Sequence, residues 1–140
     1  MPAIFDYPHT VQPDEIDELG HVNNVYYLFW LQSAASAHSS AQGWNSAAFH
    51  QLGCGFVVRK HEIEYLRPAL VGQQLIIRTW VCEMKRASSM RRYQIVRALD
   101  NRLLCQAATD WAFVDLQTGI PRRIPVEVSS SFTLVVENPS

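Results

Sequence analysis

Between Leu19 and Val58, this 140-residue chain has no aspartate, glutamate, lysine or arginine. An uncharged stretch of that length is typical of a membrane-spanning helix, but a span requires about 18 or more consecutive apolar residues. The longest unbroken apolar run in the stretch is Val25–Leu31, and the polar residues Gln32 and Ser33 follow it directly. The absence of charge therefore does not indicate a membrane segment.

The start of the chain lacks the apolar core of a secretory signal peptide, because Asp6, His9 and Gln12 occupy its place. An excess of basic charge is also missing, since 12 lysines and arginines stand against 13 acidic residues and the formal net charge is −1. Such a balance gives no general attraction to nucleic acid or to an anionic membrane. We expect a cytoplasmic protein that binds neither nucleic acid nor a membrane.

Cysteine is scarce and occurs only as Cys54, Cys82 and Cys105. Their odd number and the lack of a Cys-x-x-Cys spacing exclude a disulfide framework and a zinc knuckle. We expect reduced thiols that pack as small, buried apolar side chains. Cys54, flanked by two glycines, could act as a nucleophile with His50 or His61, but no neighbouring group indicates a thiol of lowered pKa.

Other catalytic signatures are absent as well. The chain has no Gly-x-Ser-x-Gly of a serine hydrolase and no glycine-rich phosphate loop after a predicted strand. His61, Glu62 and the remaining histidines lack the spacing of metal ligands, so we expect no metal site. An apolar fraction of 48% with 18% charged residues still indicates a folded protein. Its length suits one domain, which we place over residues 1–140.

The uncharged stretch predicts one long helix over residues 24–42. Asn23 and Asn24 are favourable N-cap residues, because a short amide side chain can accept hydrogen bonds from the first free N–H groups of a helix. Gly43 is a typical stop signal after a helix. Apolar and aromatic residues occupy nearly every face of this segment, so we expect a central helix that is covered on most sides.

The remaining chain predicts strands. Residues 3–12 form a short first candidate, and four later segments are rich in Val, Ile, Tyr, Trp and Thr: 57–66, 73–84, 90–99 and 103–115. Asp100-Asn101 is a hairpin turn between the last two of these segments, and the short links favour an antiparallel meander. Phe132–Val136 could return as an edge strand.

One long helix with about five antiparallel strands is an α+β arrangement, in which the sheet curves around the helix. A single helix cannot cover both faces of so many long strands. We therefore expect a second subunit to close a face or an edge of the sheet. A homodimer or a homotetramer would satisfy this requirement.

A motif precedes the predicted helix. Residues 14–27 read Asp-Glu-Ile-Asp-Glu-Leu-Gly-His-Val-Asn-Asn-Val-Tyr-Tyr. This segment resembles the loop signature of the 4-hydroxybenzoyl-CoA thioesterase family of the hotdog fold, and residues 65–72 and 118–125 are similar to later parts of that family's pattern. The resemblance implies a long central helix wrapped by a curved antiparallel sheet. It also implies hydrolysis of an acyl-CoA to a carboxylic acid and coenzyme A, with no cofactor, because coenzyme A is part of the substrate.

The chemistry of the loop agrees with that activity. Thioester hydrolysis needs a base or nucleophile near the carbonyl carbon and donors for the oxyanion, and the first N–H groups of a helix are free donors. The resemblance assigns the catalytic carboxylate to Asp17, as nucleophile or general base. It assigns the oxyanion donor to the backbone N–H of Asn24 or Val25. We expect Glu15 to support the loop, and His21 to orient the loop or polarise the substrate.

Every lysine and arginine lies after the uncharged stretch. Four of them flank a predicted turn at residues 87–89: Lys85, Arg86, Arg91 and Arg92. This cluster is either a solvated hairpin rim or a contact surface for the phosphates of coenzyme A, which the fork of an arginine suits. Further candidates for that contact are Arg59, Lys60 and Arg67.

Two other functions stay open. A hotdog hydratase or dehydratase would need a catalytic histidine with an acid near the helix, and residues 24–42 contain no acid. Some relatives carry a histidine seven residues after the catalytic aspartate, but Asn24 stands there in this chain. An acyl-CoA or acyl-carrier-protein binding module could use the same groove without hydrolysis, although Asp17 and Gly20 disfavour it. The identity of the acyl group is undefined.

Overall fold

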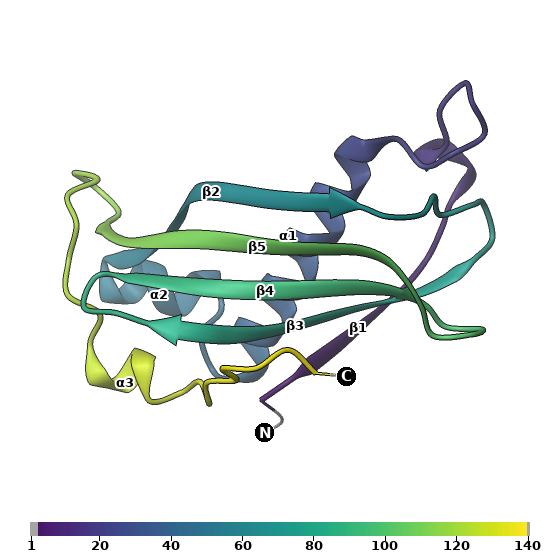
Figure 1. Cartoon of the computed structure of the whole chain (residues 1–140). Coiled ribbons are helices and arrows are strands. Elements are labelled where there is room, and N and C mark those ends of the chain that lie inside the picture. Colours follow the sequence, from purple (N-terminus) through teal and green to yellow (C-terminus); the bar gives the residue numbers. More distant parts are fainter. Residues whose placement is uncertain (1–2, 140) are drawn as a thin grey trace.

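The computed structural model describes residues 3–139. Its elements, in chain order, are β1 (Phe5–Thr10), the 3₁₀ helix η1 (Pro13–Glu15), α1 (Asn24–Ala41), α2 (Ser46–Leu52), β2 (Cys54–Tyr65), β3 (Gln74–Met84), β4 (Ser88–Arg97), β5 (Arg102–Asp115) and α3 (Val126–Ser129). The five strands form one antiparallel sheet in the order β1-β3-β4-β5-β2. The helix α1 crosses one face of this sheet (Figure 1). The predicted α+β arrangement is confirmed, and no helix in the described residues is long and apolar enough to cross a membrane.

The helix α1 begins where Asn23 caps it, because the Asn23 side chain accepts a hydrogen bond from the Val25 N–H at 3.1 Å. Buried side chains recur at helical spacing on one face: Tyr27, Trp30, Leu31, Ala34, Ala35 and His38. The other face is open, and Phe29 is 57% exposed and Val25 49%. The prediction of a helix covered on most sides is therefore wrong for the single chain, because only the face toward the sheet is packed.

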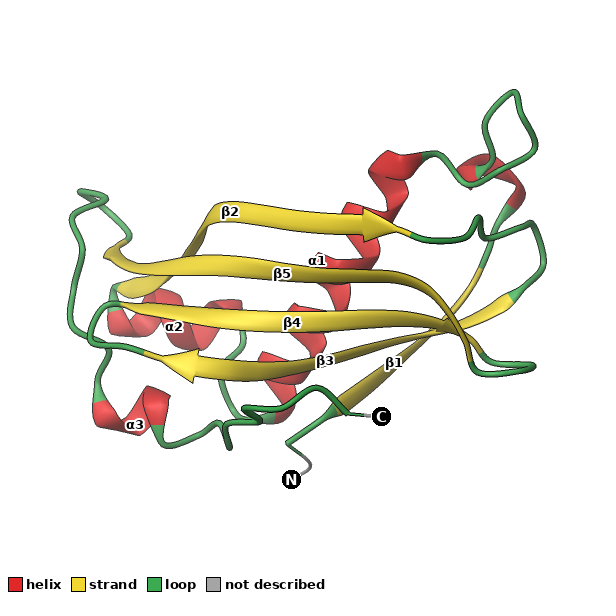
Figure 2. Ribbon diagram, viewed as in Figure 1, coloured by secondary structure: helices red, strands yellow, loops and turns green. Residues whose placement is uncertain are grey.

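The strands β3, β4 and β5 are neighbours joined by hairpins, as the meander prediction requires. Asn101 in the β4–β5 turn has φ 56°, a region that asparagine tolerates well. β2 pairs with β5 rather than with β3, so the prediction of one continuous meander is wrong at this strand. The linker 66–73 carries the chain past the start of α1, where the Val22 N–H donates to the Ala69 carbonyl at 3.2 Å. β1 and β2 are therefore the two edges of the sheet (Figure 2).

The segment after β5 does not form a strand between residues 126 and 139. Phe132 is buried and belongs to a core cluster with Val81 and Phe113. The Val135 N–H donates to the Val81 carbonyl at 2.9 Å, but the contact does not continue as a ladder. The predicted edge strand at Phe132–Val136 is wrong, because Phe132 turns into the core instead.

The short helix α2 was not predicted from the sequence. Its seven residues are too few to show a clear helical period of apolar residues. Two sequence signals, an N-cap residue and a C-terminal glycine, are nevertheless present at its ends. The Asn45 side chain caps it by accepting a hydrogen bond from the Ala48 N–H at 2.8 Å, and Gly53 ends it with φ 81°.

The three cysteines are free thiols. Cys105 is buried, and burial raises the pKa of its thiol to about 12. Cys54 and Cys82 are half-buried, which is more exposure than the sequence predicted. Because a thiol with so high a pKa stays protonated near neutral pH, Cys105 is an unreactive part of the core.

Candidate active site

Asp17 closes a tight turn between η1 and α1. Its N–H donates to the His21 carbonyl at 2.7 Å, and its Oδ1 accepts hydrogen bonds from the N–H groups of Leu19 (2.9 Å) and His21 (3.2 Å). An isolated bridge between Ile16 and Val22 closes the base of the turn. Backbone donors thus fix one oxygen of the carboxylate. The other oxygen, Oδ2, accepts no hydrogen bond from any residue within 3–139, which leaves it open to substrate or water.

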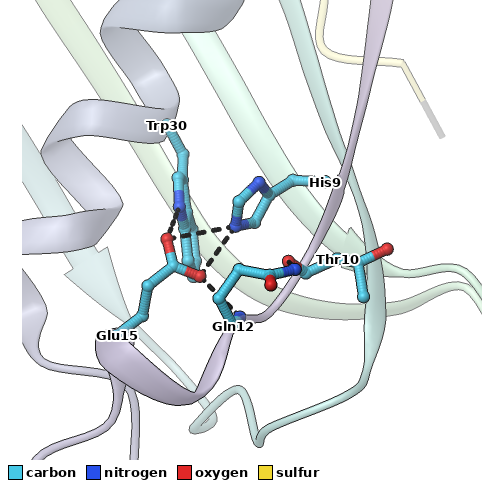
Figure 3. Close-up of polar contacts among 5 residues, drawn as sticks. All are labelled: His9, Thr10, Gln12, Glu15 and Trp30. Atoms are coloured by element: carbon cyan, nitrogen blue, oxygen red, sulfur yellow. Dashed lines mark hydrogen bonds and ion pairs between the residues drawn. The ribbon is translucent and has the colours of Figure 1, made fainter.

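Glu15 is the buried carboxylate that supports this turn (Figure 3). It accepts hydrogen bonds from the Trp30 Nε1–H (2.9 Å) and the Gln12 N–H (2.8 Å), and it lies 2.9 Å from the His9 Nε2. Burial acts to raise the pKa of Glu15, but hydrogen bonds from Gln12, His9 and Trp30 outweigh it and hold that pKa below its ordinary value. One carboxylate therefore joins β1, η1 and α1, and fixes the segment that leads to Asp17.

The N-terminus of α1 presents one open backbone donor. The Val25 N–H is taken by the Asn23 side chain at 3.1 Å, and the Tyr26 N–H by the Asn23 carbonyl at 2.9 Å. The N–H of Asn24 donates to nothing in the described part of the chain. Of the two predicted oxyanion donors, Asn24 is the one left for a ligand. His21 is exposed and contributes its backbone, rather than its ring, to the turn.

The residues predicted to contact phosphates do not form one cluster. Arg59 and Lys60 are exposed on β2, where a bulge interrupts the pairing with β5. Arg86 and Lys85 are exposed on the turn between β3 and β4, and the Lys85 ammonium lies 3.0 Å from a Glu83 oxygen. The first two cations thus lie on the edge strand β2, whereas the other two lie on the turn between β3 and β4, and β5 stands between β2 and β4.

Arg91 departs from the prediction of a surface cation. Only 6% of it is exposed, and its Nη1 donates to the His38 Nδ1 at 2.9 Å and the Thr79 Oγ1 at 3.1 Å. Successive side chains of a strand point to opposite faces. Arg91 therefore faces α1, while its neighbour Arg92 faces the other side of the sheet. Of the two interpretations of this cluster, the solvated rim is therefore wrong for Arg91, and its contact with the phosphates of coenzyme A stays a prediction.

A cavity of about 540 Å³ lies beside the C-terminal half of α1. Its lining comes from α1, α2, four strands and the segment after α3, from Ala35 to Phe132, and this scatter along the chain is why no sequence motif indicated it. Arg91 is part of the lining. At about 1.5 Å per helical residue, Ala35 is roughly 16 Å along α1 from Asn24. In one chain the cavity and the Asp17 turn therefore lie at opposite ends of α1.

Residues 11–132 match the sequence profile of the thioesterase-like superfamily. The chain belongs to this superfamily. The matched residues include the Asp17 turn, all of α1 and four of the five strands. The expectation drawn from the loop motif, a hotdog-fold thioesterase family, is confirmed.

Individual members of the superfamily resemble the chain over nearly their whole length. The acyl-CoA thioester hydrolase YbgC of Escherichia coli is 28% identical over 130 residues, which cover 93% of this chain and 96% of that protein. A probable thioesterase from Bartonella henselae superposes with a TM-score of 0.81 at 26% identity, covering 88% of this chain and 100% of that one. Slr0204, a 1,4-dihydroxy-2-naphthoyl-CoA thioesterase from Synechocystis, gives a TM-score of 0.84 at 19% identity, over 91% and 94% of the two chains. The fold is thus the hotdog fold of the superfamily.

Proposed function

We propose that this protein is an acyl-CoA thioesterase, which hydrolyses a thioester to a carboxylic acid and coenzyme A. The observation that carries the proposal is the arrangement at the start of α1. There two groups have no hydrogen-bond partner among residues 3–139: the carboxylate oxygen Oδ2 of Asp17 in the turn and the backbone N–H of Asn24 in the helix. Membership of the thioesterase-like superfamily and similarity to an acyl-CoA thioester hydrolase support the substrate class.

The two groups have complementary roles in this proposal. The Asn24 N–H, at the positive end of the α1 dipole, stabilises the oxyanion that develops on the thioester carbonyl. Asp17 acts in one of two ways. As a nucleophile it attacks the carbonyl carbon and expels the thiolate of coenzyme A, and water then hydrolyses the mixed anhydride. As a general base it removes a proton from the attacking water.

The Asp17→Asn variant tests the assignment, because it keeps the shape of the side chain and removes its charge. We expect hydrolysis of acyl-CoA to fall on the order of 10²-fold or more, with an unchanged unfolding curve. Asp14→Asn is the matched control, since Asp14 is an exposed carboxylate three residues earlier, in η1, and it should keep full activity. Thiol release over aromatic, short and long acyl-CoA thioesters is the measurement. Full activity in Asp17→Asn would refute the role of Asp17.

We also propose that the active unit is a homodimer joined along the free edge of β2. The Tyr65 hydroxyl reaches the Asn24 carbonyl at 3.5 Å, so one end of β2 lies at the start of α1. Gly55 and Phe56 at the other end line the cavity. A two-fold axis pairs two β2 strands antiparallel. Such pairing would bring the Asp17 turn of one subunit to the cavity of the other, so that each site needs both chains.

The exposed face of α1 provides a test of the dimer. Phe29→Glu places a charge on that face at a position that the single chain leaves 57% exposed, so it should not unfold the subunit. We expect it to convert the dimer to a monomer and to lower activity together with the dimer fraction. Leu99→Glu is the control, because Leu99 is 92% exposed on the β4–β5 turn, away from α1. Sedimentation equilibrium measures the mass, and a Phe29→Glu protein that is still dimeric would exclude this interface.

The exposed cations supply the proposed contacts for coenzyme A. Arg59 and Lys60 lie on β2, next to the proposed dimer edge, and Arg86 lies on the β3–β4 turn. An exposed guanidinium or ammonium group can form an ion pair with a phosphate, and the free protein does not carry the desolvation penalty of a buried cation. Replacing each with Ala should raise KM for the acyl-CoA more than it changes kcat.

A further inference from the structure

Arg91 is a buried charge that has no counter-charge among the described residues. Its Nη1 donates to two neutral acceptors, the Nδ1 of His38 and the Oγ1 of Thr79, because a guanidinium group can only donate. No carboxylate in the described residues lies within ion-pair distance of Arg91. Its Nε and Nη2 donate to no acceptor between residues 3 and 139. Most of the hydrogen-bonding capacity of this side chain is therefore unused.

The burial of such a group is costly. Desolvation lowers the pKa of Arg91, yet an arginine side chain stays protonated in a protein. A guanidinium that is buried without an anion loses its hydration free energy. Two hydrogen bonds to neutral acceptors offset only part of that loss. An anion that accepts two hydrogen bonds from the guanidinium would supply the missing partner. The adjacent cavity is where such an anion can enter, because Arg91 lines it.

The rest of the cavity defines what the anion is attached to. Among the described residues that line the cavity there is no Asp, Glu or Lys, and Arg91 is the one Arg. The buried and half-buried part of the wall is largely apolar: Phe56, Val81, Met84, Trp111 and Phe132. The exposed rim is mostly polar and contains one apolar residue, Leu116: Ser36, Ser40, Asn45, Ser46, His50 and Leu116. A ligand that fits these surroundings has an apolar body with one anionic end.

We infer that this cavity binds the distal part of an acyl group that ends in a carboxylate, and that Arg91 recognises this carboxylate. The substrate class is then the mono-CoA thioester of a dicarboxylic acid. The inference rests on the proposed function, since the thioester lies at the Asp17 turn of one subunit and the acyl chain extends into the cavity of the other. Arg91 sets specificity in this scheme and takes no part in the bond-breaking step.

Two acyl-CoA substrates of equal chain length test the inference. Suberoyl-CoA and octanoyl-CoA both carry eight-carbon acyl groups, and only the first ends in a carboxylate. We expect the wild-type protein to prefer suberoyl-CoA in kcat/KM. Arg91→Met should lower this preference on the order of 100-fold, the scale of losing one partner of a buried charge pair. Arg91→Lys, which keeps the charge but not the fork, should retain part of it. A wild-type protein that hydrolyses both substrates equally well would overturn the inference.

Binding measurements separate this inference from the proposed function. In an Asp17→Asn background, calorimetry should show that suberoyl-CoA binds more tightly than octanoyl-CoA only when Arg91 is present. That result supports the inference even if the protein with Asp17 hydrolyses neither thioester, which would reject the proposed function alone. Equal binding of the two thioesters rejects the inference and leaves the role of Asp17 intact.

The mass and fold of the Arg91 variants complete the test. If Arg91→Met is monomeric while the wild-type protein is a dimer, Arg91 pairs with the second subunit and the inference is wrong. If Arg91→Met does not fold, as judged by circular dichroism, the Arg91→Lys protein and the two substrates on the wild-type protein decide the question.

Discussion

Glu15 and Arg91 are both buried charges that hydrogen-bond to the packed face of α1, but their surroundings differ. Glu15 reaches the helix through Trp30, and it also receives the Gln12 N–H and a contact from His9. Arg91 reaches the helix through His38, and its partners within residues 3–139 are neutral. The first charge is satisfied by the fold itself. The second is held in place by the fold, but no counter-ion for it lies in the described part of the chain.

A buried charge whose hydrogen bonds are satisfied stabilises the fold, whereas one with unused donors is available to a ligand. A buried carboxylate with donors on several elements fixes those elements relative to one another. A buried cation with spare donors beside a cavity adds little to stability and can bind an anion without reorganising. Stability measurements on the two sites should therefore give different results, and three experiments examine that contrast.

The largest effect is expected for Glu15→Ala. The substitution leaves the Trp30 indole and the Gln12 N–H without their acceptor in a buried place, and it cuts the link between β1 and α1. We expect the free energy of unfolding to fall by about 3 kcal/mol or more, the range for breaking one side of a buried polar pair. Urea unfolding is the measurement. Glu18→Ala, which replaces an exposed acid in the turn after η1, should change stability by less than about 0.5 kcal/mol. Equal effects of the two variants would contradict the structural role of Glu15.

A smaller effect is expected in the pH dependence of stability. Because the folded protein holds the pKa of Glu15 below its ordinary value of 4.5, the unfolded chain takes up the proton first as pH falls. The stabilisation by this carboxylate is present in full above pH 4.5 and is lost as pH falls through the folded pKa. Wild type and Glu15→Gln should therefore differ most in unfolding free energy near pH 7 and converge in acid. A difference that is constant from pH 7 to the acid limit would show that Glu15 does not act through its charge.

The smallest effect on stability is expected for Arg91→Met. The substitution removes the desolvated charge and keeps an unbranched apolar chain that matches the stem of arginine but ends short of the guanidinium nitrogens. It also removes a donor from His38 and Thr79, so the gain and the loss nearly cancel. We expect the free energy of unfolding to stay within about 1 kcal/mol of the wild-type value in urea unfolding. A loss as large as that of Glu15→Ala would remove the contrast between the two sites.

The elements that local patterns specify were predictable from the sequence. The long helix, three hairpin-linked strands and the Asp17 turn each depend on residues close together in the chain, such as the Asn23 cap and the turn at Asn101. The catalytic assignment of Asp17 stays a prediction, which rests on the resemblance of its loop to a known family. Of the two N–H groups predicted as oxyanion donors, that of Val25 is bonded to the Asn23 side chain, and that of Asn24 has no acceptor among the described residues.

What was not predictable depends on contacts between distant residues. β2 lies beside β5 because of the path of the linker 66–73. That linker has no periodic pattern of apolar residues from which its path could be predicted. The inward direction of Arg91 depends on which face of β4 packs against α1, and a pair of consecutive arginines does not reveal that choice. The turn of Phe132 into the core replaces a predicted strand because a pocket formed by other elements receives it.

The contacts beside the cavity affect the order in which parts of the fold can form during synthesis. The Gln42 side chain donates to the Ser131 carbonyl at 2.6 Å and the Trp44 indole donates to the Ser131 hydroxyl at 3.0 Å, across most of the chain. The contacts of Glu15, in contrast, lie within the first 30 residues. During synthesis, which runs from the N-terminus, the support of the Asp17 turn can form long before the ribosome has made the last side of the cavity. The Asp17 turn is thus supported by residues that are made early, and the cavity that Arg91 lines is closed by residues that are made late.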